Sequence, residues 1–405
     1  MLLFLASGAL LVLFTSLTVH RRTDHELRTN AAAVRTQSIL QYWLTHGYFD
    51  SAGLLIVPTP TGPVVYRNST GGEFISAFIV QKLTGTFSPR LQALHNQLLV
   101  MASSILLALL GFRLSQRFAI PIVCSVALAL ALQSVYFTFP DNLLTYWEMS
   151  ARVPWLLFAS LFLLLEERER PAVLQALAAF CMVYMEFVAG VLFALAYVAV
   201  KLLLDRPAWR RLALTIAAPV LLALGLFAAQ LLWIRAQHPE LPRTGSSFSY
   251  RTGLDGASTE HYVDQLDIAF GRHVVREGFL RAGFPQVQQL FRWAWLFAAG
   301  ALALLGVLIA AARGKVPHVV TLCLLSLLGA YILYAAVFSQ VVAIHPYFFD
   351  LMLLTPLILA LFAVAPSAIE SVARQQGIVT TVVVLLAVWV SMTHLRHYAL
   401  LYPVQ

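Results

Sequence analysis

The sequence predicts a helical protein that crosses a membrane many times. Of its 405 residues, 60% are hydrophobic and only 11% are charged, and the mean hydropathy is +0.78. A soluble domain carries about 25% charged residues. Apolar runs long enough to cross about 30 Å of hydrocarbon recur along the whole chain. We place about eleven spans, near residues 2–19, 93–112, 118–137, 153–165, 172–185, 187–204, 211–234, 292–312, 317–338, 347–365 and 377–393.

Two of these spans need separate justification. The first run, 2–19, has no charged residue ahead of it and no small-x-small cleavage site after it, so we expect a retained span rather than a cleaved signal peptide. The stretch 171–204 reads either as two short helices that meet at Glu186 or as one long bent helix.

The placement of positive charge favours two helices at Glu186. Short cytoplasmic connections of membrane proteins are enriched in Lys and Arg. With the N-terminus inside, the short inner connections carry Arg113, Arg117, Arg168, Arg170, Lys201, Arg206, Arg210, Arg211, Arg313, Lys315 and Arg374. The short outer connections carry only Arg152, and Arg396 lies in the outer C-terminal tail. Merging the pair would move Arg313 and Lys315 to the outer face.

This topology puts the long connections 20–91 and 236–291 outside, together with the shorter connections 139–152 and 339–347. We see no internal repeat, so we expect a single membrane domain over 1–405. The net charge of +8 is typical of anchoring at the inner face and of contact with lipid phosphates, and it does not favour nucleic acid. The cysteines lie in apolar runs without metal-ligand spacing and are expected to be packing residues: Cys124, Cys181 and Cys323.

The first outer connection begins with a helix signal. Thr23 and Glu26 have the spacing of a capping box. An apolar stripe at helical spacing follows, formed by Leu27, Ala31, Val34, Ile39, Tyr42 and Trp43. We therefore expect a helix to about Tyr48 on the outer membrane face, with its Trp and Tyr at headgroup depth. Asp24 is either an ordinary first-turn acid, favoured by the helix dipole, or a catalytic base.

Other outer connections carry further candidate residues. Asp141 and Glu148 lie close to an aromatic pair, Tyr146–Trp147, which suits carbohydrate binding but is also common in interfacial loops. An acid near the membrane, such as Glu186, is a functional candidate unless it lies in an exposed turn.

Phosphate-binding candidates occur in the second and fourth outer connections. Arg243-Thr-Gly and Arg251-Thr-Gly are expected to form turns that present guanidinium groups, which bind phosphate well, although a solvated loop explains them equally. His345, with Tyr347 and Asp350 before a late span, either binds a lipid phosphate or is an interfacial histidine.

The chain resembles the GT-C superfamily of integral-membrane glycosyltransferases, especially the bacterial branch similar to dolichyl-phosphate-mannose protein mannosyltransferases. The resemblance is carried by the first span followed at once by the acidic motif Thr23-Asp24-His25-Glu26, by a surface helix, by about eleven spans, and by His345-Pro346-Tyr347. It covers the architecture of the whole chain, with short motifs. Many members have two adjacent acids at this site, whereas His25 separates Asp24 from Glu26 here.

The resemblance implies inverting transfer of a sugar from a polyprenyl-phosphate-linked donor at the outer, periplasmic face of a bacterial inner membrane. Asp24 is the favoured base, with Glu26 as the other acid of the motif. The cations that would compensate the leaving phosphate are, in falling order of preference, Arg251, Arg272, His345 and Lys82. We expect no cofactor, although a divalent cation is compatible with such chemistry. The alternatives are a transporter or lipid flippase, and a non-catalytic scaffold; the sugar and the acceptor are not defined by the sequence.

Overall fold

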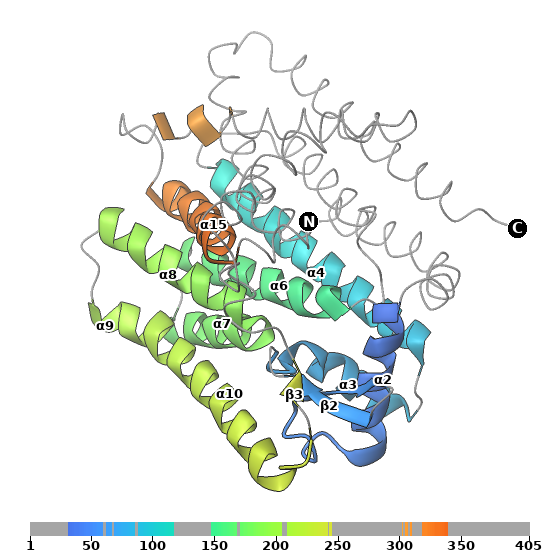
Figure 1. The fold of residues 1–405 in the computed structure, drawn as a ribbon. Coiled ribbons are helices and arrows are strands. Elements are labelled where there is room, and N and C mark those ends of the chain that lie inside the picture. Colours follow the sequence, from blue (N-terminus) through green and yellow to red (C-terminus); the bar gives the residue numbers. More distant parts are fainter. Residues whose placement is uncertain are drawn as a thin grey trace, which may run out of the picture.

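The helices of the chain form a bundle with a small α/β segment at one end (Figure 1). The computed structural model describes residues 31–59, 62–66, 69–85, 88–116, 147–167, 171–204, 209–241, 243–244, 302, 304–306, 308–309 and 318–338. The expected spans 2–19, 118–137, 347–365 and 377–393 lie outside these residues, and the span 292–312 lies mostly outside them.

The bundle confirms helices at six of the expected spans. They are α4 (Pro89–Gln116), α6 (Trp147–Glu167), α7 (Ala172–Met185), α8 (Phe187–Leu204), α9 (Trp209–Leu212), which continues through the π-helical turn η1 (Ala213–Ala217) into α10 (Ala218–Gln237), and α15 (His318–Val337).

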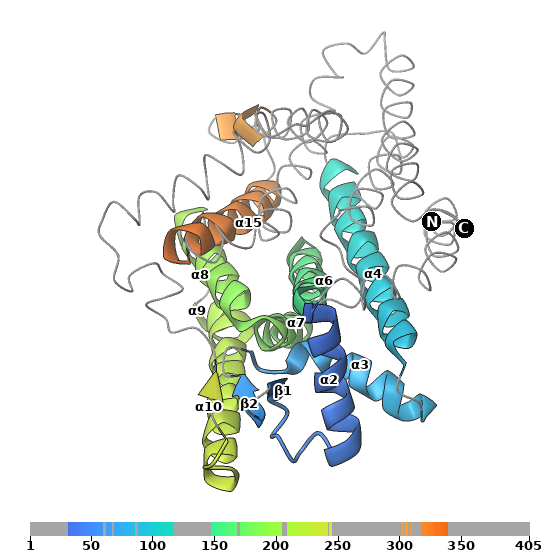
Figure 2. The same ribbon diagram turned by 45° about the vertical axis from the view of Figure 1, so that its right-hand side comes forward.

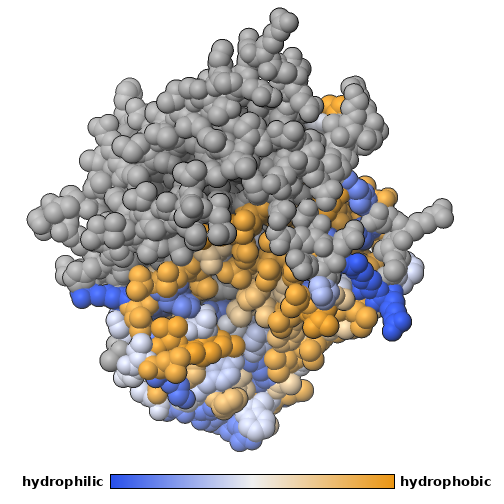
Figure 3. All heavy atoms as spheres, turned by 180° about the vertical axis from the view of Figure 1, so that it is seen from behind, coloured by the Kyte–Doolittle hydropathy of each residue, from blue (hydrophilic) through white to orange (hydrophobic). Residues whose placement is uncertain are grey.

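Three helical segments of the described part are long and apolar enough to cross a membrane: Phe187–Leu204, Trp209–Gln237 and His318–Val337. Their exposed faces carry large apolar side chains, such as Leu203 (84% exposed), Leu221 and Leu232. Seen from behind, the described helices show a broad apolar band, with hydrophilic residues at the lower tip (Figure 3). Lipid contact explains this exposure, because a water-facing surface of this kind is rare. The chain is therefore a helical membrane protein.

The turn at Glu186 is confirmed. α7 ends at Met185 and α8 begins at Phe187, with Glu186 between them in a non-helical conformation. After this turn α8 packs closely against α7, and a Cβ at Gly190 would clash with the α7 backbone at Val183. α7 has only 14 residues and is therefore about 21 Å long, shorter than a hydrocarbon layer. Its C-terminal end is thus recessed beside the longer α10.

The α/β segment occupies the end of the bundle where α7 stops. It consists of α2 (Ala31–His46), β1 (Leu55–Thr59), β2 (Gly62–Tyr66) and α3 (Gly72–Thr84), and Figure 2 shows it between α4 and α10. β1 and β2 form an antiparallel hairpin that closes at Thr59 and Gly62. Gly62 has a φ of 118°, a value that L side chains rarely adopt.

The second long connection joins this sheet. β3 (Arg243–Thr244) pairs in parallel with Val65 and Tyr66 of β2, giving the strand order β1-β2-β3. The expected turn at Arg243-Thr-Gly is therefore wrong for Arg243 and Thr244, which are extended. The sheet also corrects the expectation of an all-α protein.

The helix α2 is present, but the expectation that Trp43 faces the lipid headgroups is wrong. Trp43 is fully buried and packs edge-on against Phe74 and Phe78 of α3, with its indole N–H donating to the carbonyl of Leu54 at 3.1 Å. Ile39 and Leu40 share this core. Ile39 and Trp43 of the apolar stripe therefore face the α/β segment's own interior rather than lipid, whereas Val34 is 46% exposed.

Candidate functional site

Polar side chains hold the α/β segment on the bundle. Gln230 of α10, only 7% exposed, donates through its amide to the carbonyl of Ala52 and to the hydroxyl of Tyr184, each at 2.8 Å. The hydroxyl of Thr70 donates to the carbonyl of Tyr184 at the end of α7. Gln230 and Thr70 thus satisfy backbone carbonyls that are buried where the α/β segment meets the bundle.

Two further groups lie in the same junction. Glu73 is 1% exposed and accepts a hydrogen bond from the hydroxyl of Ser69. Burial, then the neighbouring Tyr184, then the charge of Glu73 raise the pKa of Tyr48 far above its ordinary value. Tyr48 therefore stays protonated and acts as a neutral hydrogen-bonding group. An apolar contact completes the junction, in which Leu54 and Val65 pack on Phe227 and Ile234 of α10.

A second polar group, which we call the amide trio, lies between α2, α3 and α4. It consists of Gln37, Gln81 and Gln92, which are 6%, 1% and 0% exposed. Gln37 donates through its amide to the Gln92 side-chain carbonyl. Gln81 accepts from the backbone N–H of Ser88 at 3.1 Å, and Ser88 accepts from the backbone N–H of Gln92 at 3.1 Å.

The amide trio is incompletely satisfied. Within the described part of the chain, Oε1 of Gln37, Nε2 of Gln81 and Nε2 of Gln92 have no hydrogen-bond partner. Each such buried group costs about 1–3 kcal/mol. Apolar side chains of similar size would avoid this cost, so the trio is a candidate for binding a polar molecule.

Two of the helices that carry the trio, α2 and α3, also contact α6. α2 contacts α6 as well as α3, and Figures 1 and 2 both show the first turn of α2 beside α6 and α4. Asp24 and Glu26 precede the first residue of α2 by seven and five positions. Glu148 is the second residue of α6, and Asp141 lies six positions before α6 begins.

Only two of the expected site residues lie in the described part of the chain. The backbone of Glu148 is in the first turn of α6. Lys82 is exposed on α3, with its ammonium 5.5 Å from the ring centre of Phe78. The others lie outside the described residues: Asp24, Glu26, Asp141, Arg251, Arg272, His345 and Tyr347.

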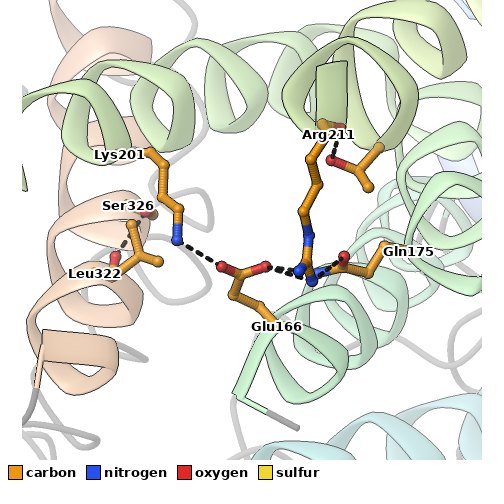
Figure 4. Close-up of polar contacts among 7 residues, drawn as sticks. Glu166, Gln175, Lys201, Arg211, Leu322 and Ser326 are labelled. Atoms are coloured by element: carbon orange, nitrogen blue, oxygen red, sulfur yellow. Dashed lines mark hydrogen bonds and ion pairs between the residues drawn. The ribbon is translucent and has the colours of Figure 1, made fainter. Parts of the chain in front are cut away.

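The opposite end of the bundle carries a charged cluster that joins four helices (Figure 4). Lys201 of α8 approaches Glu166 of α6 to 2.7 Å, and the Gln175 amide of α7 donates to the other Glu166 oxygen at 2.7 Å. Arg211 of α9 donates to the Gln175 side-chain oxygen at 3.3 Å and lies 4.0 Å from Glu166. With Glu166 only 10% exposed, these partners compensate a nearly buried carboxylate. Lys201 and Arg211 thus lie together, and the distribution of Lys and Arg along the sequence assigns both to the same side of the membrane.

Sequence reasoning missed both the junction and the amide trio. A signal for Gln230 was present, because it interrupts the apolar run 211–234. Gln81 and Gln92 gave no comparable signal, since glutamines are common near helix ends. Among the described residues no group of three His, Cys, Asp or Glu side chains is arranged to hold a metal ion.

No family model matches the chain, and no curated protein matches it either.

Proposed function

We propose that the chain is a membrane glycosyltransferase that moves a sugar from a polyprenyl-phosphate-linked donor to an acceptor at the face that carries the α/β segment. The observation that supports this most is the meeting of α2 and α6, because Asp24, Glu26 and Asp141 lie a few positions ahead of these helices in the chain and Glu148 lies in the first turn of α6. This meeting favours a reaction that needs a carboxylate base.

The chemistry is a single inverting displacement. A carboxylate, Asp24 in the first instance, takes the proton of an acceptor hydroxyl. The hydroxyl oxygen attacks the anomeric carbon, the bond from that carbon to the phosphate oxygen breaks, and the polyprenyl phosphate leaves with the electron pair. Cationic side chains stabilise the leaving phosphate, and Arg251, Arg272, His345 and Lys82 are the proposed ones.

The membrane orientation is part of the proposal. We assign the α/β segment to the periplasmic face of a bacterial inner membrane and the charged end, with Lys201 and Arg211, to the cytoplasmic face. The acceptor is a hydroxyl compound, and the membrane lipids are the other partners.

The competing assignment is a transporter or flippase. Such proteins place ionisable residues near the middle of the membrane, where they contact the substrate. The charged cluster described above lies instead at helix ends: Glu166 is the second-last residue of α6, and Lys201 is the fourth-last of α8. This position favours a structural cluster over a transport path.

The test uses full-length protein in nanodiscs with a panel of polyprenyl-phosphate-linked hexoses and pentoses, and measures release of polyprenyl phosphate. We expect the wild type to release polyprenyl phosphate from at least one donor, and Asp24→Asn to lose this release. A separate measurement of Glu26→Gln identifies which of the two acids is the base. Asp50→Asn is the matched control, because Asp50 is an acid of the same segment that bonds Tyr42. Counterflow of an intact donor without release, or normal turnover of Asp24→Asn, would contradict the proposal.

A further inference from the structure

The amide trio has the chemistry of a binding site for a neutral polar group. Its three side chains come from α2, α3 and α4, all more than nine-tenths buried. The unpaired atoms are one acceptor, on Gln37, and two NH₂ groups, on Gln81 and Gln92. The Gln37–Gln92 pair therefore offers an unpaired acceptor and an unpaired donor together, and Ser88 links Gln81 to the first turn of α4.

A sugar hydroxyl matches this combination, since it donates one hydrogen bond and accepts up to two. A phosphate matches poorly, because it accepts only and is usually held by Arg or Lys. The trio itself consists only of uncharged amides. Of the three, Gln37 lies 13 and 11 positions after Asp24 and Glu26 in the chain.

We infer that Gln37, Gln81 and Gln92 form the subsite for the sugar ring of the donor, where their amides bind its hydroxyl groups. The inference rests on the proposed function. It assigns the sugar of the donor to the three amides and the phosphate of the donor to cations elsewhere.

A sugar that binds here must displace the hydrogen bond between Gln37 and Gln92. The hydrogen bond from Gln37 to Gln92 joins α2 to α4, whereas α2 packs mainly on α3, β1 and α6. Breaking a single neutral hydrogen bond is cheap when sugar hydroxyls replace it on both sides. The bound sugar then satisfies the amide atoms that lack a partner.

The test compares two ligands in nanodiscs, a polyprenyl-phosphate hexose on which the wild type is active and polyprenyl phosphate without a sugar. The double variant Gln37→Met/Gln92→Met removes both partners of the hydrogen bond, so it leaves no new unpaired group and should fold. We expect it to bind the hexose-bearing lipid about tenfold or more weakly, and the bare lipid within about twofold. Gln81→Met should act in the same direction. Gln41→Met is the control, because Gln41 is exposed on α2.

Thermal unfolding separates this role from a structural one. The subsite predicts a double variant at least as stable as the wild type, because unpaired buried groups are removed. Unchanged discrimination between the two ligands, together with a lower melting temperature, would overturn the subsite while leaving the proposed transfer intact. If the wild type released polyprenyl phosphate from none of the donors, the proposed function would be refuted, and the subsite with it.

Discussion

Replacing Gln230 with leucine tests how the α/β segment is held on the bundle. The amide of Gln230 makes two hydrogen bonds of 2.8 Å, to the carbonyl of Ala52 and the hydroxyl of Tyr184, and a longer one of 3.4 Å to the carbonyl of Thr70. Leucine is close in size and removes the donor. The carbonyls then stay buried without this partner, which costs about 1–3 kcal/mol.

Hydrogen exchange measures this cost locally. A loss of about 1–3 kcal/mol corresponds to roughly 5- to 150-fold more frequent opening. We expect faster exchange in the segments that Gln230 holds, residues 47–54 and 69–72, with little change within α8. Gln237→Leu is the matched control, since Gln237 is exposed at the end of the same helix. Equal exchange in the two variants would refute the role assigned to Gln230.

Three further perturbations follow from the structure. Lys201→Met leaves the Glu166 carboxylate without its nearest cation and should cost about 3–5 kcal/mol in thermal or denaturant unfolding, most of it recovered when Glu166→Gln is added. Gly72→Ala places a Cβ against the carbonyl that ends α7 and should lower the melting temperature, whereas Gly225→Ala, in open space on α10, should be neutral or stabilising by up to about 1 kcal/mol. Burial, the hydrogen bond to Asp50 and the charge of that carboxylate raise the pKa of Tyr42 to about 12. Because Tyr42 ionises first in the unfolded chain, the free energy of unfolding should fall as the pH rises from about 10 to about 12. A Tyr42→Phe variant that lost as much stability over this range would contradict this.

Some elements could be predicted almost to the residue. α7 and α8 were expected at 172–185 and 187–204, and the structure gives the same bounds. Pro171 and Glu186 interrupt the apolar sequence there, and these interruptions set the expected bounds. The positive-charge bias added the information that the two runs are separate helices.

The hairpin was harder to predict for physical reasons. β1 and β2 have five residues each and contain Pro58 and Pro63, which are unusual in central strands. The pairing of β2 with Arg243–Thr244 joins segments almost 180 residues apart, and no local pattern reports such a contact.

The stripe on α2 shows a different limit. Periodicity identified the face that contains Ile39 and Trp43, but an apolar face packs equally well on lipid or on a protein core. The partner, α3 with the hairpin, became visible only in the structure. The amide trio could not be predicted for the same reason, because the burial of Gln81 and Gln92 depends on how three separate helices meet.

The sidedness of the chain is the claim on which the proposed chemistry depends, and cysteine labelling tests it most directly. In a background without the three native cysteines, Phe49→Cys reports on the α/β segment and Arg210→Cys on the charged end; both positions are exposed. We expect a membrane-impermeant maleimide to label Phe49→Cys in bacterial cells whose inner membrane is intact, and Arg210→Cys only after that membrane is permeabilised. The opposite pattern would place the α/β segment in the cytoplasm and contradict the account.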